Sequence, residues 1–183
     1  MLEQIPNIIT LLRIVAIAPI CWLLWQDAFV PAMYCLVLAG ASDALDGFLA
    51  RRYGWLTRLG AILDPLADKL FIVSVMLLFG AKAYVPEWLV VLVLGRDVVI
   101  VGGAMLYRYI TGTLEMKPLL VSKFNTAFQI LLLVVTLLHF GFYVVPEGVL
   151  MGLHASVTVT TVLSGLAYIY WWTYYFLHKE VSV

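Results

Sequence analysis

The sequence predicts an all-α membrane protein, a bundle of six transmembrane helices connected by short loops. Hydrophobic residues make up 64% of the 183 residues and charged residues 12%, with a mean hydropathy of +1.03. An ordinary soluble domain is about 45–50% apolar and about 25% charged. The apolar residues gather into six segments, each near the roughly 20 residues that a helix needs to cross a bilayer. The short connections leave no room for a soluble domain, so we expect residues 1–183 to form a single domain.

The limits of the six segments follow from the residues that interrupt the apolar runs. The first segment opens with Ile5-Pro6, and Pro6 suits the first turn of a helix because its missing N–H costs nothing there. Arg13 in the middle of this segment argues against a cleaved signal peptide. Gln26-Asp27 closes the first segment, and Pro146 closes the fifth. We expect helices over residues 5–25, 30–51, 59–81, 88–110, 122–145 and 149–177.

The basic residues of the short connections set the expected orientation. The connection between the second and third segments contains three arginines, and the region between the fourth and fifth contains one arginine and two lysines. The opposite side carries only Lys82. With six spans, both termini and the basic connections are expected on the cytoplasmic side of an inner, cytoplasmic membrane. The formal net charge is zero, which gives no indication of a nucleic-acid partner.

Four aspartates lie within two of the apolar segments, where a carboxylate is costly. A charged side chain at the centre of a spanning helix costs about 2.5–3.5 kcal/mol. Asp43 and Asp46 are three residues apart, and Asp64 and Asp68 are four apart, so each pair shares one helical face. Each pair lies one to two turns from the expected cytoplasmic end of its helix. We therefore expect the four carboxylates at one depth, near the cytoplasmic face.

Carboxylates gathered at one depth repel one another and favour a compensating cation. Oxygen ligands select Mg²⁺, Mn²⁺ or Ca²⁺ over Zn²⁺, and metal pairs held by shared carboxylates recur in phosphoryl transfer. Three interpretations of the spacing remain open: a metal-dependent enzyme, a divalent-cation transporter with acids along its ion route, and structural ion pairs. The basic residues available for structural pairing are Arg13, Arg51, Lys69 and Arg96.

Residues 43–68, the acidic stretch that contains the four aspartates, resemble the signature of the CDP-alcohol phosphotransferase family. Eight fixed positions within 26 residues agree with it, which is far more specific than a lone glycine motif. The opening Pro6-Asn7, with Thr10 and Arg13 following at intervals of three, also looks like this family. The matching positions of the acidic stretch are Asp43, Asp46, Gly47, Ala50, Arg51, Gly60, Asp64 and Asp68.

The resemblance implies a homodimeric enzyme that transfers a phosphatidyl group from CDP-diacylglycerol to an alcohol and releases CMP. It implies that the four aspartates bind two divalent cations, Mg²⁺ or Mn²⁺, with Ca²⁺ as a non-productive occupant. It assigns Asp68 as the general base for the acceptor hydroxyl. The residues expected to bind the cytidine diphosphate moiety are Gly47, Ala50, Arg51, Gly60, Asn7 and Thr10.

The fourth and fifth segments are expected to select the acceptor. Arg96, with Lys123 and Arg108, is expected to bind a phosphate of the acceptor, and an ion pair with Asp97 is the alternative for Arg96. The Arg-Asp pair, followed by Lys-Pro and Ser-Lys-x-Asn-Thr, resembles more loosely the cardiolipin synthases, whose acceptor lipid is phosphatidylglycerol. Glycerol 3-phosphate, the acceptor of the phosphatidylglycerophosphate synthases, is the alternative.

Overall fold

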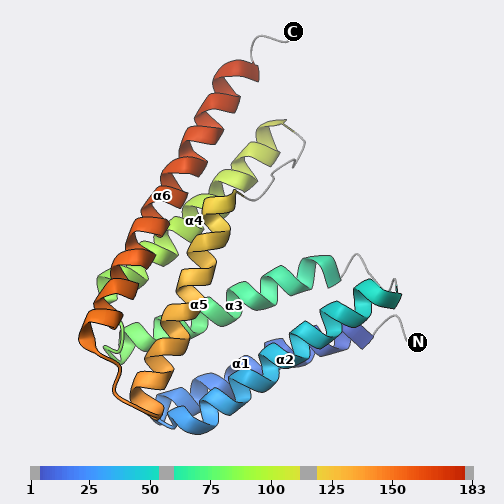
Figure 1. Ribbon diagram of the computed structural model, residues 1–183. Helices are drawn as coiled ribbons and strands as arrows, with labels where there is room; N and C mark the ends of the chain where they lie inside the picture. The colour runs from blue at the N-terminus through green and yellow to red at the C-terminus, as the bar shows by residue number, and fades with distance from the viewer. Residues whose placement is uncertain (1–4, 54–59, 112–118, 180–183) are drawn as a thin grey trace. The chain divides into compact units, whose positions relative to one another are not determined.

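The computed structural model describes residues 5–53, 60–111 and 119–179, and its side chains are described for residues 9–42, 52, 63–110 and 119–174. Apart from short connections, the chain is helical in these ranges, as the sequence predicts, and they contain no strand. Short turns join the helices where the structure describes the connection (Figure 1). The helices are α1 (Ile5–Trp25), α2 (Phe29–Tyr53), α3 (Gly60–Ala81), α4 (Glu87–Thr111), α5 (Leu120–Gly141) and α6 (Glu147–Lys179).

The expected helix limits agree with the structure to within two residues, except at the end of α5. This helix was expected to continue to residue 145, but it ends at Gly141. The amides of Phe142 and Tyr143 both donate to the Leu138 carbonyl, at 3.0 and 3.1 Å. The Val145 amide donates instead to Nδ1 of His139, at 3.1 Å. An imidazole on the last turn therefore bonds a backbone donor that no longer has an intrahelical partner.

Among the residues whose side chains the structure describes, three helices are long and apolar enough to cross a membrane: Glu87–Ile110, Leu120–Gly141 and Glu147–Tyr174. The described parts of α1 and α2 contain shorter apolar stretches, Ile9–Trp25 and Phe29–Ser42. These lengths and compositions are those of a membrane protein. The arrangement with six spans and cytoplasmic termini stays a prediction.

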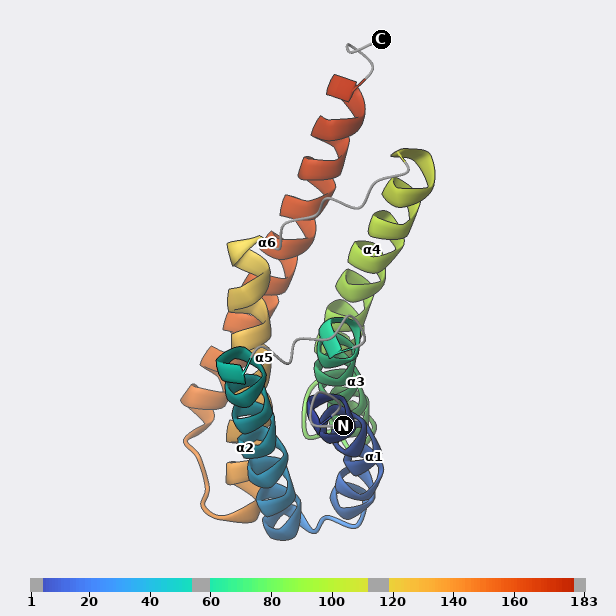
Figure 2. The ribbon, with the colours of Figure 1, turned by 90° about the vertical axis from the view of Figure 1, so that its right-hand side faces the viewer.

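The first of two compact units contains α1, α2, α3 and the end of α5, with the bounds Met1–Val85 and Val135–Val145. Within this unit α1 packs against both α2 and α3 (Figures 1 and 2). The contacts between α1 and α3 ascend together along both helices, so the two helices run parallel. Their buried side chains include Leu24, Met76 and Phe79.

The second unit contains α4, most of α5 and α6, with the bounds Pro86–Val134 and Pro146–Val183. Arg96 of α4 bonds Ser164 of α6, and further along both helices Gly103 lies against Trp172, so α4 and α6 run parallel. A Cβ atom added to Gly103 would lie 2.0 Å from the Trp172 ring. The absence of a side chain at position 103 therefore lets the indole lie directly on α4, as small residues do in membrane helix packing.

The α5 helix runs antiparallel to α6 within the second unit. Nearer the start of α5, Ser122 shares the Arg96 guanidinium with Ser164. One turn later, Oδ1 of Asn125 accepts a hydrogen bond from the Thr161 hydroxyl at 2.8 Å. Residue numbers thus rise along α5 as they fall along α6. The three helices of this unit are held by polar side chains as well as by apolar packing.

Candidate active site

Two polar contacts join α1 to α3 at the expected acidic site. The Thr10 hydroxyl donates to Oδ1 of Asp64 at 2.6 Å, and Nη1 of Arg13 donates to Oδ1 of Asp68 at 3.3 Å. Thr10 and Arg13 are three residues apart on α1, and the two aspartates are four apart on α3, so each helix presents both groups on one face. The structure thus brings together the polar opening of the chain and half of its acidic stretch.

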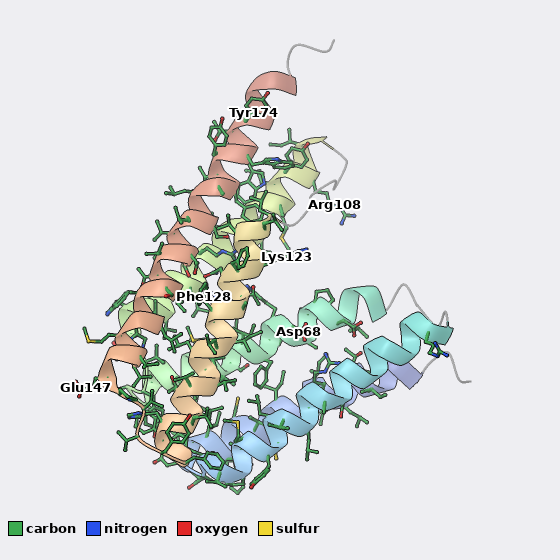
Figure 3. The ribbon with its side chains drawn as sticks, viewed as in Figure 1. Asp68, Arg108, Lys123, Phe128, Glu147 and Tyr174 are labelled. Carbon is green, nitrogen blue, oxygen red and sulfur yellow. The ribbon has the colours of Figure 1, made fainter. Side chains whose placement is uncertain are left out.

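The two α1 side chains are buried, whereas the two α3 carboxylates are exposed. Thr10 is 1% and Arg13 is 9% exposed, whereas the side chain of Asp68 is 61% exposed and Asp64 is also exposed. The α1 groups therefore support the carboxylates from within the unit, while both carboxylates stay exposed on α3, where Figure 3 labels Asp68. Arg13 balances the charge of Asp68, which lowers the cost of a carboxylate on an apolar helix.

The donor set of this face fits a hard divalent cation. Asp64 and Asp68 offer carboxylate oxygens, which Mg²⁺ and Mn²⁺ prefer. Within the described side chains, no three potential ligands lie together. The side chains of Asp43 and Asp46, the other two expected ligands, lie outside the described residues, although both positions are on the last turns of α2.

The residues expected around the cytidine diphosphate moiety are described only in part. Thr10 lies beside Asp64, as given above. Gly60 is the first residue of α3. The side-chain surroundings of Asn7, Gly47, Ala50 and Arg51 lie outside the described residues.

In the second unit, Arg96 lies buried among side chains from three helices. Its Nη1 donates to Oδ1 of Asp97 at 2.9 Å, and its Nη2 donates to the Ser122 hydroxyl at 2.6 Å and to the Ser164 hydroxyl. Its guanidinium also lies 6.0 Å from the centre of the Tyr168 ring. The ion pair with Asp97, which the sequence left open as an alternative, is confirmed. Contact between Arg96 and a phosphate stays a prediction.

The other two basic residues expected at the acceptor are exposed. Lys123 lies in the first turn of α5, and Arg108 lies in the last turn of α4 (Figure 3). The segment between these helices, residues 112–118, lies outside the described residues. Exposure leaves both cations available to an anion at this end of the second unit.

Ser164 and Tyr168 contact Arg96, and the sequence singles out neither of them. Ser164 belongs to a run of hydroxyl residues on α6, most of which bond their own helix: Ser156 and Thr158 each donate to the carbonyl four residues earlier. Thr161 and Ser164 instead face α5 and α4. Their spacing of three residues places them on one helical face, but Thr158 and Thr161 have the same spacing, so the sequence alone does not distinguish them.

A second polar cluster lies at the C-terminal ends of α1 and α3. Asp27 has φ 58° and follows α1, and its carboxylate accepts from Lys82 at 2.8 Å and from the Tyr84 hydroxyl. Bonds from Lys82 and Tyr84 lower the pKa of Asp27. Partial burial and the Asp27 carboxylate raise the pKa of Tyr84 to about 12. The cluster ties the ends of two parallel helices whose beginnings carry the acidic site.

The apolar helices and the supported carboxylates of α3 define an integral membrane protein with an acidic, oxygen-rich site. Residues 3–163 match the family model of the CDP-alcohol phosphatidyltransferases, and the chain belongs to this family. The family generally uses divalent cations, which agrees with the donor set described above.

Named relatives fall into two groups. A chloroplastic CDP-diacylglycerol–glycerol-3-phosphate 3-phosphatidyltransferase 1 of Oryza sativa is 35% identical over 89% of this chain and 52% of its own length. A cardiolipin synthase (CMP-forming) of Rattus norvegicus is 31% identical over 98% of this chain and 63% of its own length. A CDP-diacylglycerol–glycerol-3-phosphate 3-phosphatidyltransferase of Aquifex aeolicus is 33% identical over 68% and 70%, respectively. The chain thus spans between about half and two thirds of the length of the first two relatives.

Proposed function

We propose that the protein transfers a phosphatidyl group from CDP-diacylglycerol to an alcohol and releases CMP, in the synthesis of anionic phospholipids. The observation that carries this proposal is the pair of outward-facing carboxylates on α3, supported from α1 by Thr10 and Arg13. Membership of the family supports the reaction class. We further propose that it acts as a homodimer in the inner membrane, with its site near the cytoplasmic face.

The acidic stretch would hold the diphosphate of the substrate. Asp43, Asp46, Asp64 and Asp68 supply ligands for two ions of Mg²⁺ or Mn²⁺, whose chemistry is to neutralise charge on the phosphate oxygens. Ca²⁺, which takes the same oxygen ligands with a looser geometry, would be a non-productive occupant. The residues assigned to the cytidine diphosphate moiety are Gly47, Ala50, Arg51, Gly60, Asn7 and Thr10.

Asp68 would act as the general base. Its exposed carboxylate accepts the proton of the acceptor hydroxyl while the hydroxyl oxygen forms a bond to the phosphorus of the phosphatidyl group. The bond from that phosphorus to the oxygen of CMP breaks, and CMP leaves with the electron pair. Arg13 donates a hydrogen bond to Oδ1 of Asp68 and so orients the carboxylate.

Phosphatidylglycerol is the acceptor that we propose, which would make the product cardiolipin. The phosphate of this lipid would meet Arg96, Lys123 and Arg108, which come from α4 and from the first turn of α5. The rat relative carries the name of a cardiolipin synthase. Glycerol 3-phosphate is a second candidate acceptor, because the rice and Aquifex aeolicus relatives are named for it.

The reaction is tested by CMP release. Purified protein is supplied with CDP-diacylglycerol, Mg²⁺ or Mn²⁺, and either phosphatidylglycerol or glycerol 3-phosphate, with and without a chelator. We expect metal-dependent CMP release that is fastest with phosphatidylglycerol. An absence of CMP release with every alcohol, combined with metal flux into sealed vesicles that needs no nucleotide, would instead indicate a cation transporter.

A further inference from the structure

The hydrogen bonds of Arg96 leave an incomplete set of donors for any anion. A guanidinium carries five N–H groups: one on Nε and two on each Nη. In the second unit, the two N–H groups of Nη2 are directed to Ser122 and Ser164, and Nη1 is bonded to Asp97. Nε is buried and has no partner among the described residues. Arg96 itself is 8% exposed.

These hydrogen bonds prevent the bidentate contact by which arginine usually binds phosphate. A bidentate contact uses two parallel N–H bonds from one edge of the guanidinium. The two such edges are Nη1 with Nη2 and Nε with Nη2, and both require a hydrogen of Nη2. Because both of these hydrogens are bonded to serines, Arg96 can form a bidentate contact with phosphate only after one serine hydrogen bond breaks.

The charge of Arg96 is also largely balanced before any acceptor arrives. Asp97 lies 2.9 Å from Nη1, and both side chains are buried. Among the side chains that the structure describes near this end of the unit, Lys123 and Arg108 are exposed cations. A phosphodiester carries one negative charge on two free oxygens, whereas a phosphomonoester has three free oxygens and a charge of about −1.5 to −2 at pH 7. The engaged arginine therefore suits the diester better than the monoester.

We propose that Ser122 and Ser164 are positioning residues that determine acceptor specificity, because they keep Arg96 engaged within the helices and so favour a phosphodiester lipid over a phosphomonoester. This inference rests on the proposed function and concerns the choice between its two acceptors. Ser164 comes from the last helix and Ser122 from the start of α5, directly before Lys123. Each serine occupies one hydrogen of Nη2, so that removing one of them opens one edge of the guanidinium.

The test compares the two acceptors in single serine variants of the full chain. For Ser164→Ala and Ser122→Ala, kcat/KM is measured with glycerol 3-phosphate and with phosphatidylglycerol, at saturating CDP-diacylglycerol. We expect the ratio of the first to the second to rise about 5-fold or more in at least one variant, which is the effect of one hydrogen bond. The KM for CDP-diacylglycerol should not change.

Ser156→Ala is the matched control, because Ser156 lies on the same helix and its hydroxyl, among the contacts described, bonds the carbonyl of Gly152 of its own helix. Its acceptor ratio should equal that of the wild type. Ser122 is only half-buried, so its variant keeps the test available if Ser164→Ala does not fold. Folding is followed by the thermal unfolding midpoint in detergent.

Three results would overturn the inference. An active wild type with unchanged acceptor ratios in both folded serine variants overturns it alone and leaves the proposed function in place. A wild type that prefers glycerol 3-phosphate also overturns it alone. A wild type that releases no CMP with any acceptor overturns the proposed function and this inference together.

Discussion

The hydroxyl of Thr10 and the carboxylate of Asp64 are joined by a hydrogen bond of 2.6 Å between α1 and α3. Thr10 is almost fully buried, whereas Asp64 is exposed. A buried donor thus fixes the orientation of an outward-facing acid. Together with the bond from Arg13 to Asp68, it makes the first helix a support for the acidic face of the third.

The Thr10 hydroxyl should tune the metal requirement of the proposed reaction. In Thr10→Val, the shape of the side chain is kept but the donor to Asp64 is lost. Removal of such a supporting hydrogen bond typically weakens metal binding 10- to 100-fold, so we expect the half-saturating Mg²⁺ concentration to rise about 10-fold. The half-saturating concentration is measured by titrating CMP release with Mg²⁺. Thr10→Ser keeps a hydroxyl and should stay near the wild type, whereas a Val variant with an unchanged Mg²⁺ requirement would contradict the support role.

Packing between α4 and α6 should depend on the lack of a side chain at Gly103. In Gly103→Ala, the added methyl meets the Trp172 ring at 2.0 Å, and this ring must shift. Overpacking of this kind costs about 1–3 kcal/mol, so we expect a lower thermal unfolding midpoint. Gly102→Ala is the control, because a Cβ there meets nothing within 4 Å. It should be neutral or stabilising, and equal midpoints for the two variants would contradict the close packing.

Ala83 follows the end of α3 in a left-handed backbone conformation. Its φ is 57°, and the amides of Ala83 and Tyr84 bond the carbonyls of Gly80 and Phe79, as in a Schellman helix end. A left-handed conformation costs an ordinary residue about 1–2 kcal/mol, part of which glycine regains. We expect Ala83→Gly to raise the free energy of unfolding by about 0.5–1 kcal/mol. Ala81→Gly, in the last turn of the helix, should lower the free energy of unfolding by up to about 1 kcal/mol. A lower free energy of unfolding in both variants would contradict the left-handed conformation assigned to Ala83.

The Asp27 cluster should make stability depend on pH in two separate ranges. Because the pKa of Asp27 is lowered in the folded state, its contribution is present above the ordinary value of 3.8 and is lost as pH falls below it. Because the pKa of Tyr84 is raised from 10.0 to about 12, its contribution is present below pH 10 and is lost as pH rises through 12.

Thermal unfolding midpoints of the wild type, Asp27→Asn and Tyr84→Phe measure these two contributions. Asparagine tolerates the left-handed conformation of position 27, so the variant reports mainly the lost charge. The wild type should exceed Asp27→Asn at neutral pH, and the difference should shrink in acid. It should exceed Tyr84→Phe up to pH 10, and this difference should shrink in strong alkali. Differences that do not vary with pH would show that the cluster makes no ionic contribution.

The helix limits and the acidic face were predictable because they depend on local sequence. Apolar runs set the length of each helix, and the spacing of four between Asp64 and Asp68 places them on one face in any helix. The end of α5 was not predictable from apolar content, because residues after Gly141 are also apolar. There, the bond from Val145 to the His139 ring replaces a helical one.

The contacts of Arg96 depend on tertiary structure, which cannot be deduced from the spacing of residues along the sequence. Ser164 is 68 residues from Arg96 in the chain and stands among several serines and threonines of similar composition on α6. A hydroxyl in a helix can bond its own backbone, as Ser156 does, or a neighbouring helix, as Ser164 does. Only the packing of the helices decides between these two.

The central claim is most directly tested by CMP release from CDP-diacylglycerol by the wild type, Asp68→Asn and Asp27→Asn, measured side by side with phosphatidylglycerol and Mg²⁺. Asparagine at position 68 can still accept the bond from Arg13 but cannot take a proton, so the rate should fall about 10²- to 10⁴-fold while the thermal midpoint stays close to that of the wild type. Asp27→Asn removes an aspartate far along α1 from Thr10 and should keep full activity. Substantial CMP release by Asp68→Asn would contradict the account.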